Sequence, residues 1–272
     1  MLNNKDFNDK NNNVDAINII LEKNNAFECK ELFLNKTPPF VPNSIALKAR
    51  PLCYDGVAVL YSGLRKSPLY VAEIYNKSSR AKKTSFNVPN ALFSDTRLPV
   101  DERASPVDYD GNIFGINFDL KINNGIPMAP EVSRRKWAVY EEQATRNINQ
   151  ANGNVYVITG SVFTPNICGL GIVSRQLLES DHEYVPYGVA KIVEKSAKVY
   201  GIPSRYDVGA CTIGNGVIVP TFIYKLVFDS SAGRAWAYWI ENTNSTRIDA
   251  PISYAELVRR TGINFFPGVK IF

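Results

Sequence analysis

Histidine is almost absent from this sequence of 272 residues, which contains a single one, His182, in the acidic run from Glu179 to Glu183. Neither a second histidine nor a cysteine lies near it at the spacing that metal ligands require. This scarcity excludes a metal centre built from clustered histidines. His182 has two interpretations, a relocated general base or metal ligand and a solvated side chain in a surface turn, and the second is favoured.

Long apolar runs are also missing. No stretch of about 18 apolar residues occurs, so we expect no membrane-spanning segment. Residues 1–25 are dominated by Asn, Lys and Asp, which predicts a flexible arm that is either disordered or ordered against a partner. The arm has neither the basic nor the apolar region of a secretory leader. Either a leader has been removed, export uses another route, or the protein is intracellular.

Cysteine is scarce too, with four residues that allow three pairings. Cys29 and Cys53 bracket a proline-rich segment, whereas Cys168 and Cys211 bracket a segment with several glycines. Disulfides in these two pairs would each stabilise a long loop by roughly 2–4 kcal/mol. Four buried free thiols in a reducing compartment are the alternative. Two pairs in loop-rich segments favour an oxidising location, the bacterial periplasm or cell envelope, over the cytoplasm.

The rest of the composition is that of an ordinary globular protein, with 45% hydrophobic and 21% charged residues. Apolar segments predict strands at residues 69–74, 155–160, 217–228 and 235–240. The aromatic residues Trp236, Tyr238 and Trp239 could stack on nucleic-acid bases. Alternate aromatic residues in a strand are more often packing residues, and we expect that role here.

Two helices are predicted, the first preceded by a loop and flanked by the strands at residues 69–74 and 155–160, the second after the strand at residues 235–240. The first opens at Ser133 as its N-cap, because Trp137, Tyr140 and Ala144 then recur at helical spacing. The second covers residues 253–261, where Ser253 and Glu256 form a capping box. Gly262 ends that second helix.

Residues 164–217 form an insertion between strands, with helical patterns at residues 173–178 and 189–200. Such an insertion is either an interaction surface or decoration that stabilises the fold.

The order and spacing of several segments resemble the DNA/RNA non-specific endonuclease family. The segments are residues 52–62, 67–73, 93–99 (Phe-Ser-Asp-Thr-Arg-Leu-Pro), 108–150, 155–163, 219–225 and 260–268. The resemblance implies an α+β fold of the ββα-metal nuclease type, with a central, mainly antiparallel sheet flanked by helices. To this fold the cysteine positions add a disulfide-clipped insertion, which the family lacks at this length. The resemblance also implies one nuclease-like domain over residues 26–272, with residues 164–217 as an inserted subdomain.

The catalytic signature of that family is degenerate in this chain. The resemblance places Phe118, or in a second register Pro127, at the position of the histidine general base, and neither side chain can accept a proton. Ser133 occupies the position of the asparagine that holds Mg²⁺, and hydroxyl oxygen is a weaker ligand for this hard cation. Asn124 and Glu141 match family positions. No cofactor is therefore expected, and Mg²⁺ only if the chain is an active nuclease.

Basic residues are the remaining candidates for a ligand-binding surface. Candidates to bind a phosphate or a protein partner are Lys82, Lys83, Arg134, Arg135 and Lys136. The net charge of +5 and the pI near 8.9 suit weak, salt-sensitive contact but do not indicate a committed nucleic-acid binder.

Three functions follow from these patterns. The first is a non-catalytic nuclease-fold subunit of a larger protein assembly, for example a bacterial cell-envelope or secretion-system complex. The second is a Mg²⁺-dependent endonuclease with a relocated base such as His182. The third is a nucleic-acid binder that does not hydrolyse its ligand.

Overall fold

The computed structural model describes residues 26–42, 45–46, 48–76, 94–109, 115–116, 125–129, 131–164 and 212–271. Outside these ranges lie the predicted arm at residues 1–25, the basic pair Lys82 and Lys83, and most of the insertion with both of its expected helices. Among the described residues, no helix is both long and apolar enough to cross a membrane.

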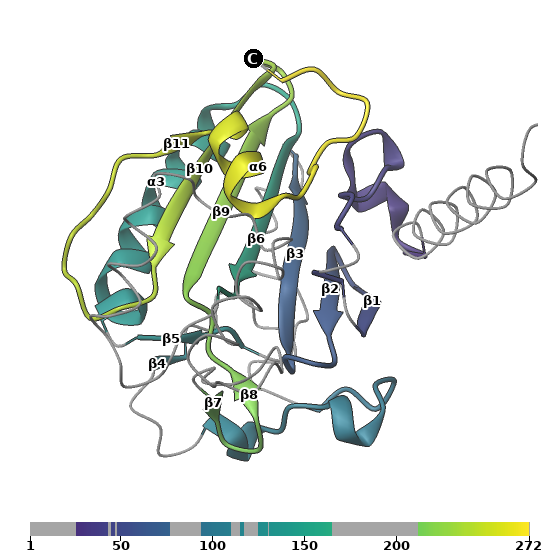
Figure 1. Cartoon of the computed structure of the whole chain (residues 1–272). Helices are drawn as coiled ribbons and strands as arrows, with labels where there is room; N and C mark the ends of the chain where they lie inside the picture. Colours follow the sequence, from purple (N-terminus) through teal and green to yellow (C-terminus); the bar gives the residue numbers. More distant parts are fainter. Residues whose placement is uncertain are drawn as a thin grey trace, which may run out of the picture.

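A large antiparallel sheet is the centre of the fold (Figure 1). In the described residues it has seven strands in the spatial order β1-β2-β3-β6-β9-β10-β11, and neighbouring strands are antiparallel. Their bounds are β1 Ala49–Tyr54, β2 Val57–Ser62, β3 Ser67–Tyr75, β6 Val155–Val162, β9 Phe222–Asp229, β10 Arg234–Glu241 and β11 Ile252–Ser253. The predicted α+β class with a mainly antiparallel sheet is thus confirmed.

The strand predictions hold with one correction. Residues 69–74, 155–160 and 235–240 lie within β3, β6 and β10. The predicted strand at residues 217–228 is divided into β8 (Val217–Ile218) and β9, with Pro220 between them. Proline has no amide hydrogen to donate to a strand ladder, which explains the break.

Short elements complete the described chain. They are η1 Lys30–Leu32, η2 Leu34–Lys36, η3 Val100–Glu102, η4 Pro106–Tyr109 and β7 Thr212–Ile213. Strand β7 pairs with β8 in a small hairpin.

The first helix begins earlier than its sequence predicts. A π-helical segment, η5 (Val132–Lys136), continues into α3 (Trp137–Gln150), and the residue that precedes η5 is Glu131. The backbone amide of Ser133 already donates to the Ala129 carbonyl at 3.0 Å, so Ser133 lies inside the helix and its predicted N-cap role is wrong.

The second helix, α6 (Tyr254–Thr261), confirms its prediction. The hydroxyl of Ser253 accepts a hydrogen bond from the Glu256 amide, and Gly262 ends the helix with a positive φ of 67°. The Glu256 carboxylate accepts instead from Arg259 and Arg260. Only one half of the capping box is therefore present.

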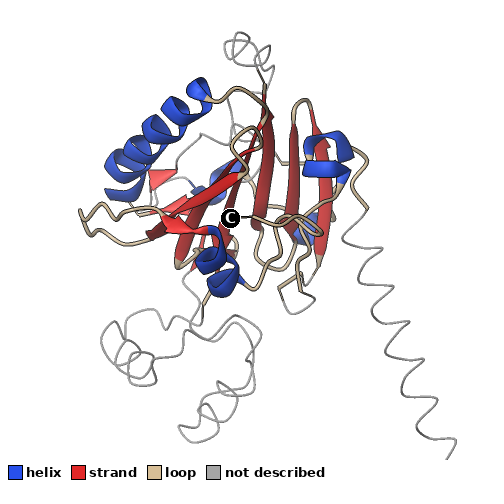
Figure 2. Cartoon of the chain, turned by 90° about the horizontal axis from the view of Figure 1, so that it is seen from above, coloured by secondary structure: helices blue, strands red, loops and turns tan. Residues whose placement is uncertain are grey.

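The two helices cover opposite faces of the sheet, as Figure 2 shows. Trp137 and Tyr140 of α3 belong to a core cluster on one face. Leu257 of α6, with Phe265 and Phe266 of the closing segment, belongs to the cluster on the other face. Burial on both sides explains why the central strands are almost continuously apolar. The aromatic residues of β10 pack as expected, since Tyr238 and Trp239 are buried and Trp236 is half-buried.

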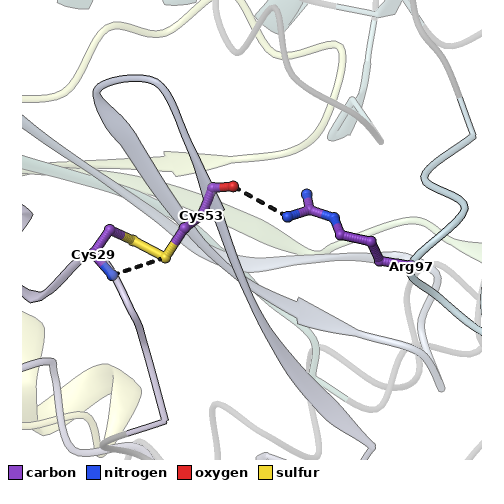
Figure 3. Close-up of a disulfide and its surroundings, with 3 residues drawn as sticks. All are labelled: Cys29, Cys53 and Arg97. Atoms are coloured by element: carbon purple, nitrogen blue, oxygen red, sulfur yellow. Dashed lines mark hydrogen bonds between the residues drawn. A yellow bond between two sulfur atoms is a disulfide. The ribbon is translucent and has the colours of Figure 1, made fainter.

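A disulfide joins Cys29 to Cys53 and ties the segment before η1 to the edge strand β1 (Figure 3). The Cys29 amide donates to Cys53 Sγ at 3.1 Å, and the Cys53 carbonyl accepts from Arg97 at 3.1 Å. One of the two predicted disulfides is thus confirmed. Cys168 and Cys211 lie outside the described residues.

Replacing Cys29 and Cys53 together by serine is expected to lower the free energy of unfolding by about 3 kcal/mol, because the bond closes a loop of 24 residues. Urea denaturation of the variant and of the oxidised wild type measures the difference. Wild-type protein treated with a reductant is the second comparison and should lose at least as much, because reduction also opens the predicted Cys168–Cys211 bond. Equal stability of all three samples would contradict the structural role of this disulfide.

Candidate nuclease site

The site is built on two short strands that lead directly into the helix. Strand β4 (Gly115–Ile116) pairs with β5 (Pro127–Met128), with Gly115 opposite Met128 and Ile116 opposite Pro127. The sequence predicts a loop here and assigns residues 69–74 and 155–160 to the strands that flank the helix. Those two segments instead pair with each other as β3 and β6 within the large sheet. The ββα unit is therefore β4, β5 and the helix formed by η5 and α3.

One of the two candidate positions for the general base lies within this hairpin. Pro127 lies on β5, and Phe118 follows β4 by two residues. Pro127 is buried, as are its neighbours Ile126 and Met128. Phe118, Asn124 and His182 lie outside the described residues.

Asn242, which follows β10, fixes the second arm of the hairpin. Its side-chain oxygen accepts from the Ala129 amide at 2.7 Å, and its Nδ2 donates to the carbonyls of Pro127 at 3.0 Å and Pro220 at 2.8 Å. These hydrogen bonds satisfy backbone groups that are buried beside the helix start. The position of β5 is thus set by a residue that lies more than a hundred positions later in the chain.

Glu141 of α3, which the sequence resemblance predicts to occupy the family's carboxylate position, forms an ion pair with Lys225 of β9. The Lys225 side chain is 7% exposed and the Glu141 side chain 26% exposed. The Lys225 ammonium also lies 5.1 Å from the ring centroid of Trp137, which is one helical turn before Glu141. The Glu141–Lys225 ion pair therefore joins α3 to the sheet, and the Trp137 ring packs against its ammonium group.

Hydroxyl groups accompany Lys225 on the same face of the sheet. Thr159 of β6 is directly opposite Lys225, and Ser161 lies two residues further along β6. Both hydroxyls are buried and have no hydrogen-bond partner in the described part of the chain. The face of the sheet beneath α3 is thus polar at this end and apolar elsewhere.

Lys225 was not among the residues that sequence patterns single out for the site. The available signal is a charged residue within the apolar strand Phe222–Asp229. Lysine is almost never fully buried without a partner, so its occurrence there indicates a paired side chain. The partner's identity requires the fold.

The basic cluster at the helix start is divided between surface and interior. Arg135 is 71% exposed and lies 3.6 Å from Glu131. Lys136, in contrast, is only 3% exposed, so it is not a surface contact in this structure. Burial lowers the pKa of Lys136, against the opposing influence of Glu241, Asp249 and Glu131. The side chain of Arg134 is not described.

The segment that leads to β4 is held by two buried carboxylates. Asp108 accepts from the Ser105 amide at 2.7 Å and from Asn215 Nδ2 at 2.6 Å, which ties η4 to the β7–β8 turn. Asp95 accepts from Tyr54 at 2.7 Å and from Arg97 Nη2 at 2.6 Å. Burial alone would raise the pKa of Asp95, but the hydrogen bonds from Arg97 and Tyr54 outweigh it and hold the pKa at about 2. Both carboxylates are thus committed to the scaffold.

A hairpin followed by a helix, packed on a large antiparallel sheet, defines a nuclease scaffold of the ββα-metal type. The fold is similar to that of a chain in a crystal structure of the EndoG/EndoGI complex, which was determined to explain how EndoG is inhibited. The TM-score is 0.56 at 18% sequence identity, and the match covers 82% of this chain and 87% of the other. At this identity the likeness concerns the fold alone.

The family follows from the sequence itself. Residues 118–272 match the model of the DNA/RNA non-specific endonucleases, and the chain belongs to that family. No curated protein sequence matches the chain.

Proposed function

We propose that this chain is a non-catalytic member of the endonuclease family that acts as a structural or protein-binding subunit. The observation that carries the proposal is the ion pair between Glu141 and Lys225. Where the family places a carboxylate beside Mg²⁺, this chain supplies an ammonium group from its own sheet.

The site residues that the structure describes, Ser133 and Glu141, do not fit Mg²⁺. Hard divalent cations require several oxygen ligands at about 2.0–2.1 Å in octahedral geometry. Glu141 already neutralises Lys225, and an ammonium at that carboxylate repels a second cation. Ser133 offers a hydroxyl oxygen, which is a weaker ligand for Mg²⁺ than the amide carbonyl oxygen of asparagine. No cofactor is therefore part of the proposal.

The base is missing for a separate reason. A proline or a phenylalanine at the base position cannot take a proton from water, and a general base contributes roughly 10²–10⁴ in rate. The chain's single histidine, His182, belongs to the insertion rather than to the hairpin. Loss of base and loss of metal ligand support the same conclusion independently.

A protein partner is favoured over nucleic acid as the ligand of this scaffold. The similar fold in the EndoG/EndoGI complex is held by a second protein, which gives a precedent for docking on such a scaffold. The Cys29–Cys53 disulfide supports an oxidising location. We therefore place the subunit in the bacterial periplasm or cell envelope, for example in a secretion-system complex.

A nuclease assay tests the catalytic part of the proposal. Purified chain is incubated with plasmid DNA and with RNA in Mg²⁺ and in Mn²⁺, beside an active family member as the positive control. We expect no cleavage above buffer. Cleavage by the wild type that disappears in a His182→Ala variant would overturn the proposal in favour of a relocated base.

Size-exclusion chromatography of the native protein tests the subunit role. Elution of the native protein from its source only as a free monomer would count against that role.

A further inference from the structure

A cleft of about 640 Å³ opens between the C-terminal half of α3 and the start of β10. The helix contributes Gln143, Arg146, Asn147 and Gln150, which lie on one face at helical spacing, and the strand contributes Arg234 and Trp236. Neither Glu141 nor Lys225 lines it. The cleft is therefore separate from the site described above, and its volume suits a short ligand segment.

The charge of this cleft has one sign. Arg146 and Arg234 line it, and no acidic side chain does so among the described residues. Arg146 is 64% exposed and lies 3.7 Å from Glu142, which is itself exposed. Such an exposed ion pair contributes little to stability. Arg146 can therefore leave Glu142 and pair with an anionic ligand at a small cost in free energy. The cleft is thus complementary to a ligand with at least two negative charges.

An indole forms part of the floor. Trp236 is half-buried, and its Nε1 donates to the hydroxyl of Tyr238 at 3.4 Å, which holds the ring in place. The guanidinium of Arg234 lies 5.6 Å from the ring centroid. Tryptophan and arginine are both enriched among the residues that dominate binding energy at protein interfaces. Together they offer a planar apolar contact next to a charged one.

The helix wall distinguishes between ligand classes. Three of its four lining residues are carboxamides, each of which can donate to and accept from a peptide group. A single strand of nucleic acid instead carries a phosphate at every nucleotide and needs a basic groove that follows the backbone. Two arginines around one indole do not form such a groove. The wall fits a polypeptide better.

We infer that this cleft binds an acidic, extended segment of a partner protein, with carboxylates at Arg146 and Arg234 and an aromatic side chain on Trp236. The inference deepens the proposed function, on which it rests, by naming the docking face and the chemistry of the partner. Because both arginines are exposed, they can be replaced without disturbing the core.

Fluorescence anisotropy of the full chain tests the inference. The probe is a fluorescein-labelled peptide of about ten residues that alternates glutamate and tyrosine. The comparison probes are the same peptide with glutamine for glutamate and an oligothymidylate of equal length. An Arg146→Gln/Arg234→Gln variant is compared with Arg247→Gln/Arg259→Gln, which removes the same charge from exposed arginines outside the cleft.

We expect the acidic peptide to bind wild type, and its affinity to fall about tenfold or more in the cleft variant but less than about twofold in the control variant. Equal losses in both variants would overturn the inference, because they would reflect net charge alone. Equal binding of the neutral peptide, tighter cleft-dependent binding of the oligonucleotide, or no binding of any probe would also overturn it. Nuclease activity is measured on the same samples. A failure of the proposed non-catalytic function is thus distinguished from a failure of the cleft to bind the acidic peptide.

Discussion

Replacing Glu141 by glutamine is expected to lower the free energy of unfolding by about 3 kcal/mol. The substitution leaves the Lys225 ammonium almost fully buried without its counter-charge, and breaking a buried ion pair in this way costs about 3–5 kcal/mol. We expect the lower end of that range because a quarter of the Glu141 side chain is exposed, which admits some solvent. Urea denaturation followed by circular dichroism measures the change.

The matched variants separate the charge pair from simple loss of contacts. Lys225→Met keeps the volume of the side chain but leaves the buried Oε1 of Glu141 without its ammonium partner. Because 26% of the Glu141 side chain is exposed, we expect a loss of about 2 kcal/mol, below that of Glu141→Gln. The double variant Glu141→Gln/Lys225→Met should recover much of the loss, because no uncompensated charge remains. A Glu141→Gln variant as stable as wild type would show that the pair is not a structural element of this fold.

The sheet and the second helix were predictable because their signals are local. Strands β3, β6 and β10 are apolar runs of ordinary strand length, and α6 has its cap residue Ser253 and its stop residue Gly262 in the sequence itself. Each of these elements would be expected from a window of a few residues. The fold class and the family were then predicted from the order and spacing of these segments along the chain.

The start of the first helix could not be read locally. Ser133 is a good N-cap by residue type, yet the helical turn forms before it, at Ala129, whose amide donates to Asn242. That hydrogen bond joins residues far apart in sequence. The short strands β4 and β5 escaped prediction for the same reason, since two-residue strands are defined by their pairing and not by a pattern.

The chemistry at the site divides in a similar way. Residue types at the family positions were visible in the sequence, and Pro127, Ser133 and Glu141 lie on the hairpin and helix of the ββα unit. The partner of Glu141 was not visible, because Lys225 reaches it only when β9 is placed beneath α3. The burial of Lys136 likewise depends on how η5 packs and not on the run of basic residues around it.

Replacing Trp137 by alanine is expected to be the most destabilising single change of those considered, with a loss of about 3–5 kcal/mol in the free energy of unfolding. The indole is 1% exposed and belongs to the core cluster between α3 and the sheet. Its removal leaves a cavity and also withdraws the ring on which the Lys225 ammonium rests. Thermal and urea denaturation measure the loss, with Trp236→Ala as a control that should cost only about 1–2 kcal/mol because Trp236 is half-buried.

A Trp137→Phe variant separates the two contributions. Phenylalanine keeps an aromatic face for the ammonium but fills less volume, so we expect a loss of about 1–2 kcal/mol, well below that of alanine. If Trp137 supports the ion pair, adding Glu141→Gln to Trp137→Ala should cost less than the sum of the two single changes, because the ammonium is more hydrated once the ring is gone. Strict additivity would mean that the indole fills the core without supporting the charge pair. In that case the tryptophan and the carboxylate, although one helical turn apart, would be retained for unrelated reasons.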